Sequence, residues 1–180
     1  SDAEESYGAS LAMPRTIAKK SNEGWVINGR KVFITGGDLA NRICVFAALE
    51  GEGMDSWTCF IVEKGMPGFS AGRNELKMGQ KASSASELIF NNVLVPPTHQ
   101  IGKLRGGWAI NRAVLNISRM PVGAIALGIA RGAMENAIEF VCSQKVGGKT
   151  LINYQDVQQK VAQMYMETSA MRAMLWQSAN

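Results

Sequence analysis

Histidine and cysteine, the residues that most often build metal sites and nucleophilic catalytic sites, are scarce in this sequence. His99 is the single histidine, it follows two prolines in a predicted loop, and no CxxC or Cys/His spacing occurs. One imidazole without a cluster of thiolates or carboxylates completes neither a metal site nor a catalytic triad. The sequence therefore predicts no metal centre.

Features of exported and membrane proteins are also missing. Cys44, Cys59 and Cys142 are odd in number, far apart and surrounded by apolar residues, as buried free thiols in a reducing compartment are. No apolar run reaches the roughly 18 residues of a membrane span, and no charged-then-apolar leader opens the chain. We expect a protein of the cytoplasm, or of the mitochondrial matrix if the source is a eukaryote, with no membrane span.

The charge balance is mildly basic, with 19 Lys and Arg against 15 Asp and Glu and a pI near 9.1. The basic residues are scattered, and the pair Lys19–Lys20 is the nearest approach to a cluster. Nucleic-acid binding calls for a basic stripe with interleaved aromatic residues, so we expect no nucleic-acid partner. A small anionic ligand such as a phosphorylated cofactor is compatible with this charge.

The chain changes character near residue 100. Before it, short β-rich segments alternate with turn signals, and Asn28-Gly29 between two apolar runs predicts a hairpin. The expected strand segments are Gly8 to Lys20, Trp25 to Ile27, Arg30 to Thr35, Ile43 to Glu50, Trp57 to Glu63 and Glu87 to Val95. After it, apolar residues recur at helical spacing in 108–144 and from 154 onward, with a glycine-rich break at 146–149. The expected fold is α+β: an antiparallel β-sandwich or open barrel in residues 1–99, then antiparallel helices of a partial four-helix bundle in 100–180.

Small residues are dense in the middle of the first helical stretch, and methionines recur in the second. Glycine and alanine between residues 123 and 133 would let another helix approach closely, which favours burial in a bundle. Pro121 should kink that helix near residues 117 and 118. The methionines at 164, 166, 171 and 174 are interpreted as core filler rather than ligands.

The run Arg-Lys-Val-Phe-Ile-Thr-Gly-Gly at 30–37 ends an alternating strand on a ring, a hydroxyl and two glycines. Phe33 and Thr35 are two apart and share a face on a strand, and the glycines let the chain turn with no Cβ to block a ligand. The combination suits a flat cofactor held against backbone. Taken alone, it is better explained by ordinary packing in a sheet.

Several stretches in order resemble one family, the flavin-dependent acyl-CoA dehydrogenases, over essentially all 180 residues. Each stretch alone is weak, whereas their order and spacing together make chance similarity improbable. They are Ser1-Asp2-Ala3, Gly24 to Gly29, Val32 to Gly37, Glu75 to Ser83, Ile89 to Pro96, Ser118-Arg119, Gly148-Lys149 and Tyr154-Gln155.

The resemblance implies FAD as cofactor, with Phe33, Ile34 and Thr35 where family members usually carry Trp-Ile-Thr. The ring would lie against the isoalloxazine and the threonine hydroxyl would hydrogen-bond flavin N5. Phe for Trp keeps a stacking surface but removes an indole donor. Ser1 matches the serine of a Gly-Ser-Asp motif that lines both the flavin and the acyl-CoA site.

The resemblance also implies a substrate contact on the first helix. Arg119 matches an arginine near the CoA moiety, where a guanidinium would suit phosphate or carbonyl oxygens, and a helix-surface ion pair is an equally good interpretation. Asn116 stands where the family has an aspartate, so the usual network around Arg119 is altered.

A further FAD contact is implied after the first helix. Gln144, Lys145 and Val146 stand where many members have Arg-Lys-Thr, which reaches the FAD pyrophosphate of a neighbouring subunit. Gln144 lacks the charge, so Lys145 and Lys149 are candidates to replace it. Tyr154 and Gln155 follow in the same motif, where Asn153-Tyr154 replaces a common Glu-His.

The family needs a carboxylate to take the substrate's α-proton. The resemblance implies a glutamate late in the helical bundle in most members and immediately before the helix arginine in a minority, and this sequence has Ser118 at the second position. The base is therefore expected beyond Asn180, in a longer polypeptide of which these residues are an inactive fragment, and no catalytic residue is assigned in this chain. Expected partners are an acyl-CoA substrate, an electron-transfer protein and further copies in a homodimer or homotetramer. Two alternatives stay open: another flavin oxidase on this scaffold, or a non-enzymatic interaction module that has lost the cofactor.

Overall fold

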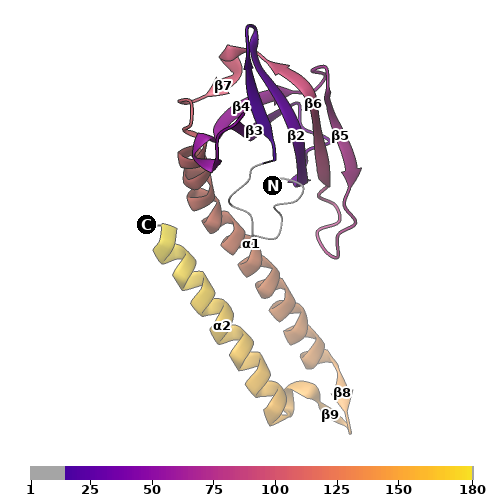
Figure 1. Ribbon diagram of the computed structural model, residues 1–180. Helices are drawn as coiled ribbons and strands as arrows, with labels where there is room; N and C mark the ends of the chain where they lie inside the picture. Colours follow the sequence, from indigo (N-terminus) through magenta and orange to yellow (C-terminus); the bar gives the residue numbers. More distant parts are fainter. Residues whose placement is uncertain (1–14, 180) are drawn as a thin grey trace. The chain divides into compact units, whose positions relative to one another are not determined.

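The computed structural model describes residues 15–179, which form two compact units that divide between Arg112 and Ala113 (Figure 1). The first unit carries seven strands in one hydrogen-bonded sheet, and the second is dominated by two long helices. Short 3₁₀ turns occupy Met54–Ser56, Pro97–His99 and Leu151–Asn153. The strands are β1 Ile17–Ser21, β2 Gly24–Thr35, β3 Arg42–Leu49, β4 Thr58–Glu63, β5 Phe69–Asn74, β6 Ala85–Val95 and β7 Gln100–Ile101.

The sheet order is β5-β6-β2-β1-β3-β4-β7, and all neighbouring pairs are antiparallel except β1 with β3. The sheet curves over its own apolar face, because Trp25 of β2 and Phe60 of β4 have ring centroids 5.7 Å apart although β1 and β3 separate them in the sheet. Both side chains belong to one core cluster supplied by β1, β2, β3, β4 and β6. The predicted α+β class with a mostly antiparallel β domain is confirmed.

The predicted hairpin at Asn28-Gly29 is wrong. Residues 24–35 form one continuous strand, and the turn lies earlier, at Asn22 and Glu23 between β1 and β2. Asn28 instead fills an irregularity of β6: its Oδ1 accepts from the Asn92 backbone N–H at 2.8 Å, and its Nδ2 donates to Asn92 Oδ1 at 3.0 Å. Gly29 marks a close approach, since a Cβ there would lie 2.6 Å from Thr16 Cα.

Two further strand predictions needed correction. The segment expected at Gly8 to Lys20 forms a strand only from Ile17, with residues 8–14 outside the described part of the chain, and β5 was not predicted. The glycine-rich break at 146–149 is a small hairpin, β8 Lys145–Val146 with β9 Lys149–Thr150. Its two turn glycines have φ of 56° and 76°, as a type I′ turn requires.

The second unit contains α2 Gln155–Ala179 and most of α1 Gly107–Ser143, antiparallel to each other (Figure 1). α1 runs without interruption through Pro121. The close helix approach predicted for the small residues of 123–133 is found at Gly123, where a Cβ would lie 2.8 Å from Leu175 Cδ2, whereas a Cβ on Gly128 or Gly132 would stand in open space. Among the described residues of the two helices Gly107 alone is buried. The methionines of α2, interpreted from the sequence as core filler, therefore lie half-buried or exposed in this structure.

The structure bears on two expectations, about membrane spans and about the thiols. α1 is long and apolar enough to cross a membrane by length and composition, although it contains no unbroken apolar run of that length, and one such helix is weak evidence for a span. Only Cys59 of the three thiols is buried, whereas Cys44 and Cys142 are exposed.

Candidate functional site

The end of β2 contains a β-bulge at Phe33. Lys31 pairs with Leu88 and Ile34 pairs with Ser86, so three steps on β2 match two on β6. Phe33 takes up the extra residue with φ of 57°, a left-handed conformation that is uncommon for a side chain other than glycine. Its ring is 55% exposed, while Ile34 packs against the core. Strained backbone that turns an apolar ring to the outside indicates a ligand contact.

Thr35 and Gly36 continue this outward surface. Thr35 is exposed and pairs with Ala85, so the sheet fixes its backbone while the residue stays open to solvent. Gly36 has φ of 64°, donates its N–H to Ser84 O at 3.1 Å, and would place a Cβ in open space. A ring, a hydroxyl and uncovered backbone therefore lie in sequence on one exposed edge, which we call the strand-end platform, residues 33–36.

Gly37, directly after the strand-end platform, packs closely against β6. A Cβ there would lie 2.7 Å from Ser86 Oγ and 3.0 Å from Leu88 Cδ2, so only glycine fits without movement. Ser86 is fully buried, and its hydroxyl has no hydrogen-bond partner among the described residues. The chain turns here through a hydrogen bond from Gly37 N–H to Ile34 O at 3.1 Å.

Asp38, which the sequence did not single out, holds the turn that follows. Its carboxylate accepts from Ser84 Oγ at 2.6 Å and from Asn74 Nδ2 at 3.1 Å. These hydrogen bonds, with Ser84 contributing most, lower the pKa of Asp38 below its ordinary value. Lys64 Nζ donates to the main-chain oxygen of Asp38 at 3.2 Å. No local sequence signal marks this residue, because its partners are 36 and 46 positions away.

The segment between Asn74 and Ser84 is a loop with two apolar side chains in full contact with solvent. Leu76 and Met78 are as exposed as in an open peptide, at 103% and 102%. Two fully exposed aliphatic side chains in one short loop are unusual for a surface that stays uncovered. This loop is the Glu75 to Ser83 stretch, one of those that resemble the family, and no role was predicted for it.

A second group of predicted residues is brought together at the far end of the helical hairpin. Tyr154 Oη donates to Val146 O at 2.7 Å, and Lys149 Nζ lies 5.0 Å from the centroid of the Tyr154 ring. Gln144 O accepts from Leu151 N–H at 2.9 Å. Gln144, Lys145 and Gln155 are exposed around this hairpin. Two lysines and an amide at one exposed tip could bind an anionic group.

The remaining predicted residues are not part of that tip. Asn116 and Arg119 lie one turn apart on the exposed surface of α1, and the 24 residues from Arg119 to Ser143 span about 36 Å of helix. Within the described range Arg119 has no ion-pair partner, so the helix-surface ion pair is not formed there. Ser118 Oγ donates to Leu115 O at 3.0 Å. Ser1 lies outside the described residues.

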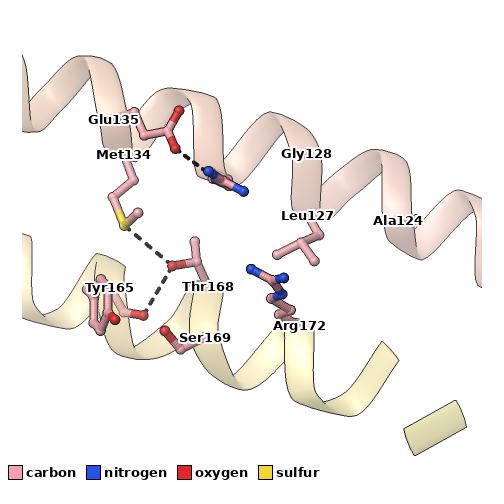
Figure 2. A pocket seen from close by; sticks show the side chains of 10 residues that line it. Ala124, Leu127, Gly128, Met134, Glu135, Tyr165, Thr168, Ser169 and Arg172 are labelled. Atoms are coloured by element: carbon pink, nitrogen blue, oxygen red, sulfur yellow. Dashed lines mark hydrogen bonds and ion pairs between the residues drawn. The ribbon is translucent and has the colours of Figure 1, made fainter. Parts of the chain in front are cut away.

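A groove lined by both apolar and polar side chains runs between α1 and α2 in the second unit (Figure 2). Thr168 Oγ1 lies 3.4 Å from Met134 Sδ and 2.8 Å from Met164 O, so one hydroxyl contacts both helices. Arg131 Nε donates to Glu135 Oε1 at 2.7 Å on one wall, and the guanidinium of Arg172 points inward from the other. No predicted site residue lines this groove, and the Thr168–Met134 contact joins its two walls.

Comparison with known sequences assigns both units to one enzyme family. The sequence model for the acyl-CoA dehydrogenase middle domain matches residues 2–93, and that for the acyl-CoA dehydrogenase C-terminal domain matches residues 105–180. The chain belongs to the acyl-CoA dehydrogenase family, a family of flavoprotein oxidoreductases. The long apolar helix α1 lies within residues 105–180, the part that matches the C-terminal domain of this family.

Particular relatives are similar over nearly the whole chain. An acyl-CoA dehydrogenase of Bacillus subtilis is 36% identical over 174 residues, 96% of this chain and 46% of the relative. The structure of butyryl-CoA dehydrogenase from Megasphaera elsdenii superposes with a TM-score of 0.88 at 37% identity, covering 91% of this chain and 43% of that one. PigA, solved with FAD and proline, gives 0.85 at 25% identity and covers 91% and 43%. The chain thus spans less than half the length of these proteins.

Proposed function

We propose that the polypeptide containing this chain is an FAD-dependent acyl-CoA dehydrogenase, which introduces an α,β double bond into an acyl-CoA thioester. The strand-end platform carries this proposal. A left-handed Phe33 with an exposed ring, an exposed Thr35 and an open Gly36 form a surface that sheet packing alone does not require.

The platform fits an isoalloxazine ring. An exposed aromatic side chain offers an offset stacking surface, and the space above Gly36 is free of side chains. Bound FAD would supply a hydride acceptor at N5. Thr35 would donate its hydroxyl to that nitrogen and stabilise the negative charge that develops there, which is effective because the sheet fixes the donor beforehand.

The hairpin tip, residues 144–146 with Lys149 and Tyr154, is proposed to bind the pyrophosphate of FAD from a neighbouring subunit. The exposed cations Lys145 and Lys149 support this, since they replace the arginine charge that Gln144 lacks. Exposed apolar side chains on both helices, such as Ile117, Phe140 and Trp176, are consistent with coverage by further protein in a homodimer or homotetramer.

The base that removes the substrate's α-proton is proposed to come from outside these 180 residues. Ser118 occupies the position immediately before Arg119 that carries the base in a minority of the family, and a serine hydroxyl is not a base near neutral pH. Asn116 and Arg119 would contact the CoA moiety, where the exposed guanidinium of Arg119 is free to bind an anion. An electron-transfer protein is the proposed acceptor of the electrons.

The test uses the full-length polypeptide, purified with its flavin, and the substitution Thr35→Val, which keeps the shape and removes the hydroxyl. We expect the rate of flavin reduction by acyl-CoA to fall by about 100-fold with bound flavin retained, the effect of removing one positioned donor. Thr98→Val, an exposed threonine in the Pro97–His99 turn, is the matched control and should leave the rate unchanged.

Other outcomes would replace this proposal. An unchanged reduction rate in the Thr35→Val variant would remove the hydroxyl from the mechanism. Rapid reoxidation of the reduced flavin by dioxygen would indicate an oxidase on the same scaffold. Absence of flavin absorbance in the full-length protein would favour a non-enzymatic module.

A further inference from the structure

Asp38 lies where three separate segments meet: the turn after β2, the end of β5 and the start of β6. Its two carboxylate oxygens take different partners, Oδ1 from Ser84 and Oδ2 from Asn74. These partners are the residues on either side of the loop 75–83. One carboxylate therefore bridges both ends of a nine-residue loop that carries the fully exposed Leu76 and Met78.

Main-chain pairing at the base of the loop is irregular. The β5–β6 register shifts between Ala71 and Asn74, and beyond the shift Asn74 pairs with Ser86 and Glu75 N–H donates to Ala85 O at 2.8 Å. On the other side Gly36 N–H donates to Ser84 O at 3.1 Å. A carboxylate that accepts from both Asn74 and Ser84 adds a charge-assisted connection between the two ends of the loop to this main-chain pairing.

We propose that Asp38 is a positioning residue that closes the base of loop 75–83 and holds it beside the strand-end platform, so that the loop's apolar side chains cover the bound cofactor. This inference rests on the proposed flavin function. Asp38 follows Gly37 directly, and Lys64 also holds it through its main-chain oxygen. The turn from Ile34 to Gly37 therefore connects the position of the Asp38 carboxylate to that of Thr35 and Gly36. Asp38 itself contacts no reacting atom.

The substitution Asp38→Asn in the full-length polypeptide tests the closure. An amide offers one acceptor oxygen, and its NH₂ would face one of the two donors, so one hydrogen bond and the charge are both lost. Glu50→Gln is the matched control, because Glu50 is also an exposed carboxylate with a side-chain partner, Lys19 at 3.0 Å.

The first measurement follows the loop without using the flavin. Lys81 is an exposed trypsin site within the loop, so mass spectrometry can follow cleavage of the Lys81–Ala82 bond under native conditions. We expect cleavage about 5- to 10-fold faster in Asp38→Asn and unchanged in Glu50→Gln. Ser84→Ala should behave like Asp38→Asn, whereas Ser84→Thr keeps the hydroxyl and should restore slow cleavage. In an Asp38→Asn/Ser84→Ala double variant the two effects should add only in part, because Ser84→Ala removes one of the two contacts that Asp38→Asn weakens.

The second measurement links the loop to the cofactor. In Asp38→Asn we expect FAD dissociation and flavin reduction each to change by about 10-fold, the former faster and the latter slower, with KM for acyl-CoA within twofold. A flavin absorption spectrum shifted from that of the Glu50→Gln protein should accompany this change.

The outcomes separate the inference from the function on which it rests. Equal cleavage in Asp38→Asn and Glu50→Gln would overturn the closure. Faster cleavage with unchanged flavin affinity, flavin spectrum and reduction rate would overturn the positioning role. Asp38 would then only hold the base of the loop. If the unsubstituted protein binds no FAD, the proposed function fails, and the cleavage series still decides whether Asp38 closes the loop.

Discussion

The contact between Gly37 and Ser86 gives a prediction about the packing behind the strand-end platform. Gly37→Ala would place a methyl group 2.7 Å from Ser86 Oγ and 3.0 Å from Leu88 Cδ2. Adding a methyl to a closely packed site costs about 1–3 kcal/mol, and we expect the opening free energy of β2 and β6 to fall by that amount. The backbone of Gly37 is not left-handed, so the effect is steric.

Ser86→Ala should act in the opposite direction. The hydroxyl is fully buried without a partner among the described residues, and an unpaired buried hydroxyl costs about 1–3 kcal/mol. Part of that gain is offset by the lost contacts of the oxygen, so we expect the single variant to be more stable by up to about 1 kcal/mol. In the Gly37→Ala/Ser86→Ala double variant the nearest clash is gone, and the stability recovered should exceed the gain of Ser86→Ala alone by about 1 kcal/mol.

Hydrogen exchange followed by mass spectrometry on the peptides that contain β2 and β6 is the assay, because it reports local opening in a protein with further domains. Strictly additive effects of the two substitutions would refute the reasoning. A loss of stability greater than about 1 kcal/mol in Ser86→Ala would show that the hydroxyl has a partner.

Three more predictions follow from the β unit. Phe33→Gly should leave the opening free energy of β2 unchanged or raise it by up to about 1 kcal/mol, because glycine adopts a left-handed φ without strain. The same substitution should weaken FAD binding, as measured by flavin fluorescence. Hydrogen bonds from Ser84 and Arg105 lower the pKa of Asp38 and Glu52 respectively, so both carboxylates stabilise the folded state at pH values above their ordinary pKa values of 3.8 and 4.5. This stabilisation is lost as the pH falls through the lower pKa values of the folded state, so the unfolding temperature of the Asp38→Asn/Glu52→Gln protein should decline less in acid than that of the unsubstituted protein. An identical decline in the two proteins would contradict the prediction. Burial, with a smaller contribution from Cys44, raises the pKa of Cys59 to about 12, so near neutral pH a thiol reagent should label Cys44 and leave Cys59 unmodified until the protein unfolds.

The strands and helices were predictable where one periodicity dominated. β3, β4 and β6 alternate or run apolar between turn signals, and the long apolar spacing of α1 and α2 gave both helices nearly at their observed bounds. The Asn28-Gly29 prediction failed because the same dipeptide serves two purposes. Here Asn28 pairs with Asn92 across the sheet and Gly29 allows Thr16 to approach, and both contacts depend on residues distant in sequence.

The candidate site was predictable in part for the same reason. Phe33, Thr35 and Gly36 are contiguous, so a local motif could indicate them, but their left-handed bulge depends on the register with β6. Asp38 stands two residues beyond Gly36 and gave no signal, since its role follows from the meeting of β5 and β6 at the loop base. The hairpin tip was located by its motif, while its β structure was missed because two-residue strands carry no periodicity.

Anaerobic titration of the purified full-length protein with acyl-CoA tests the central claim most directly. The account predicts visible flavin absorbance in the isolated protein, bleached by acyl-CoA in the unsubstituted enzyme and bleached about 100-fold more slowly in Thr35→Val. A protein that carries flavin but is not reduced by any acyl-CoA, or one in which Thr35→Val is reduced at the unsubstituted rate, would contradict it.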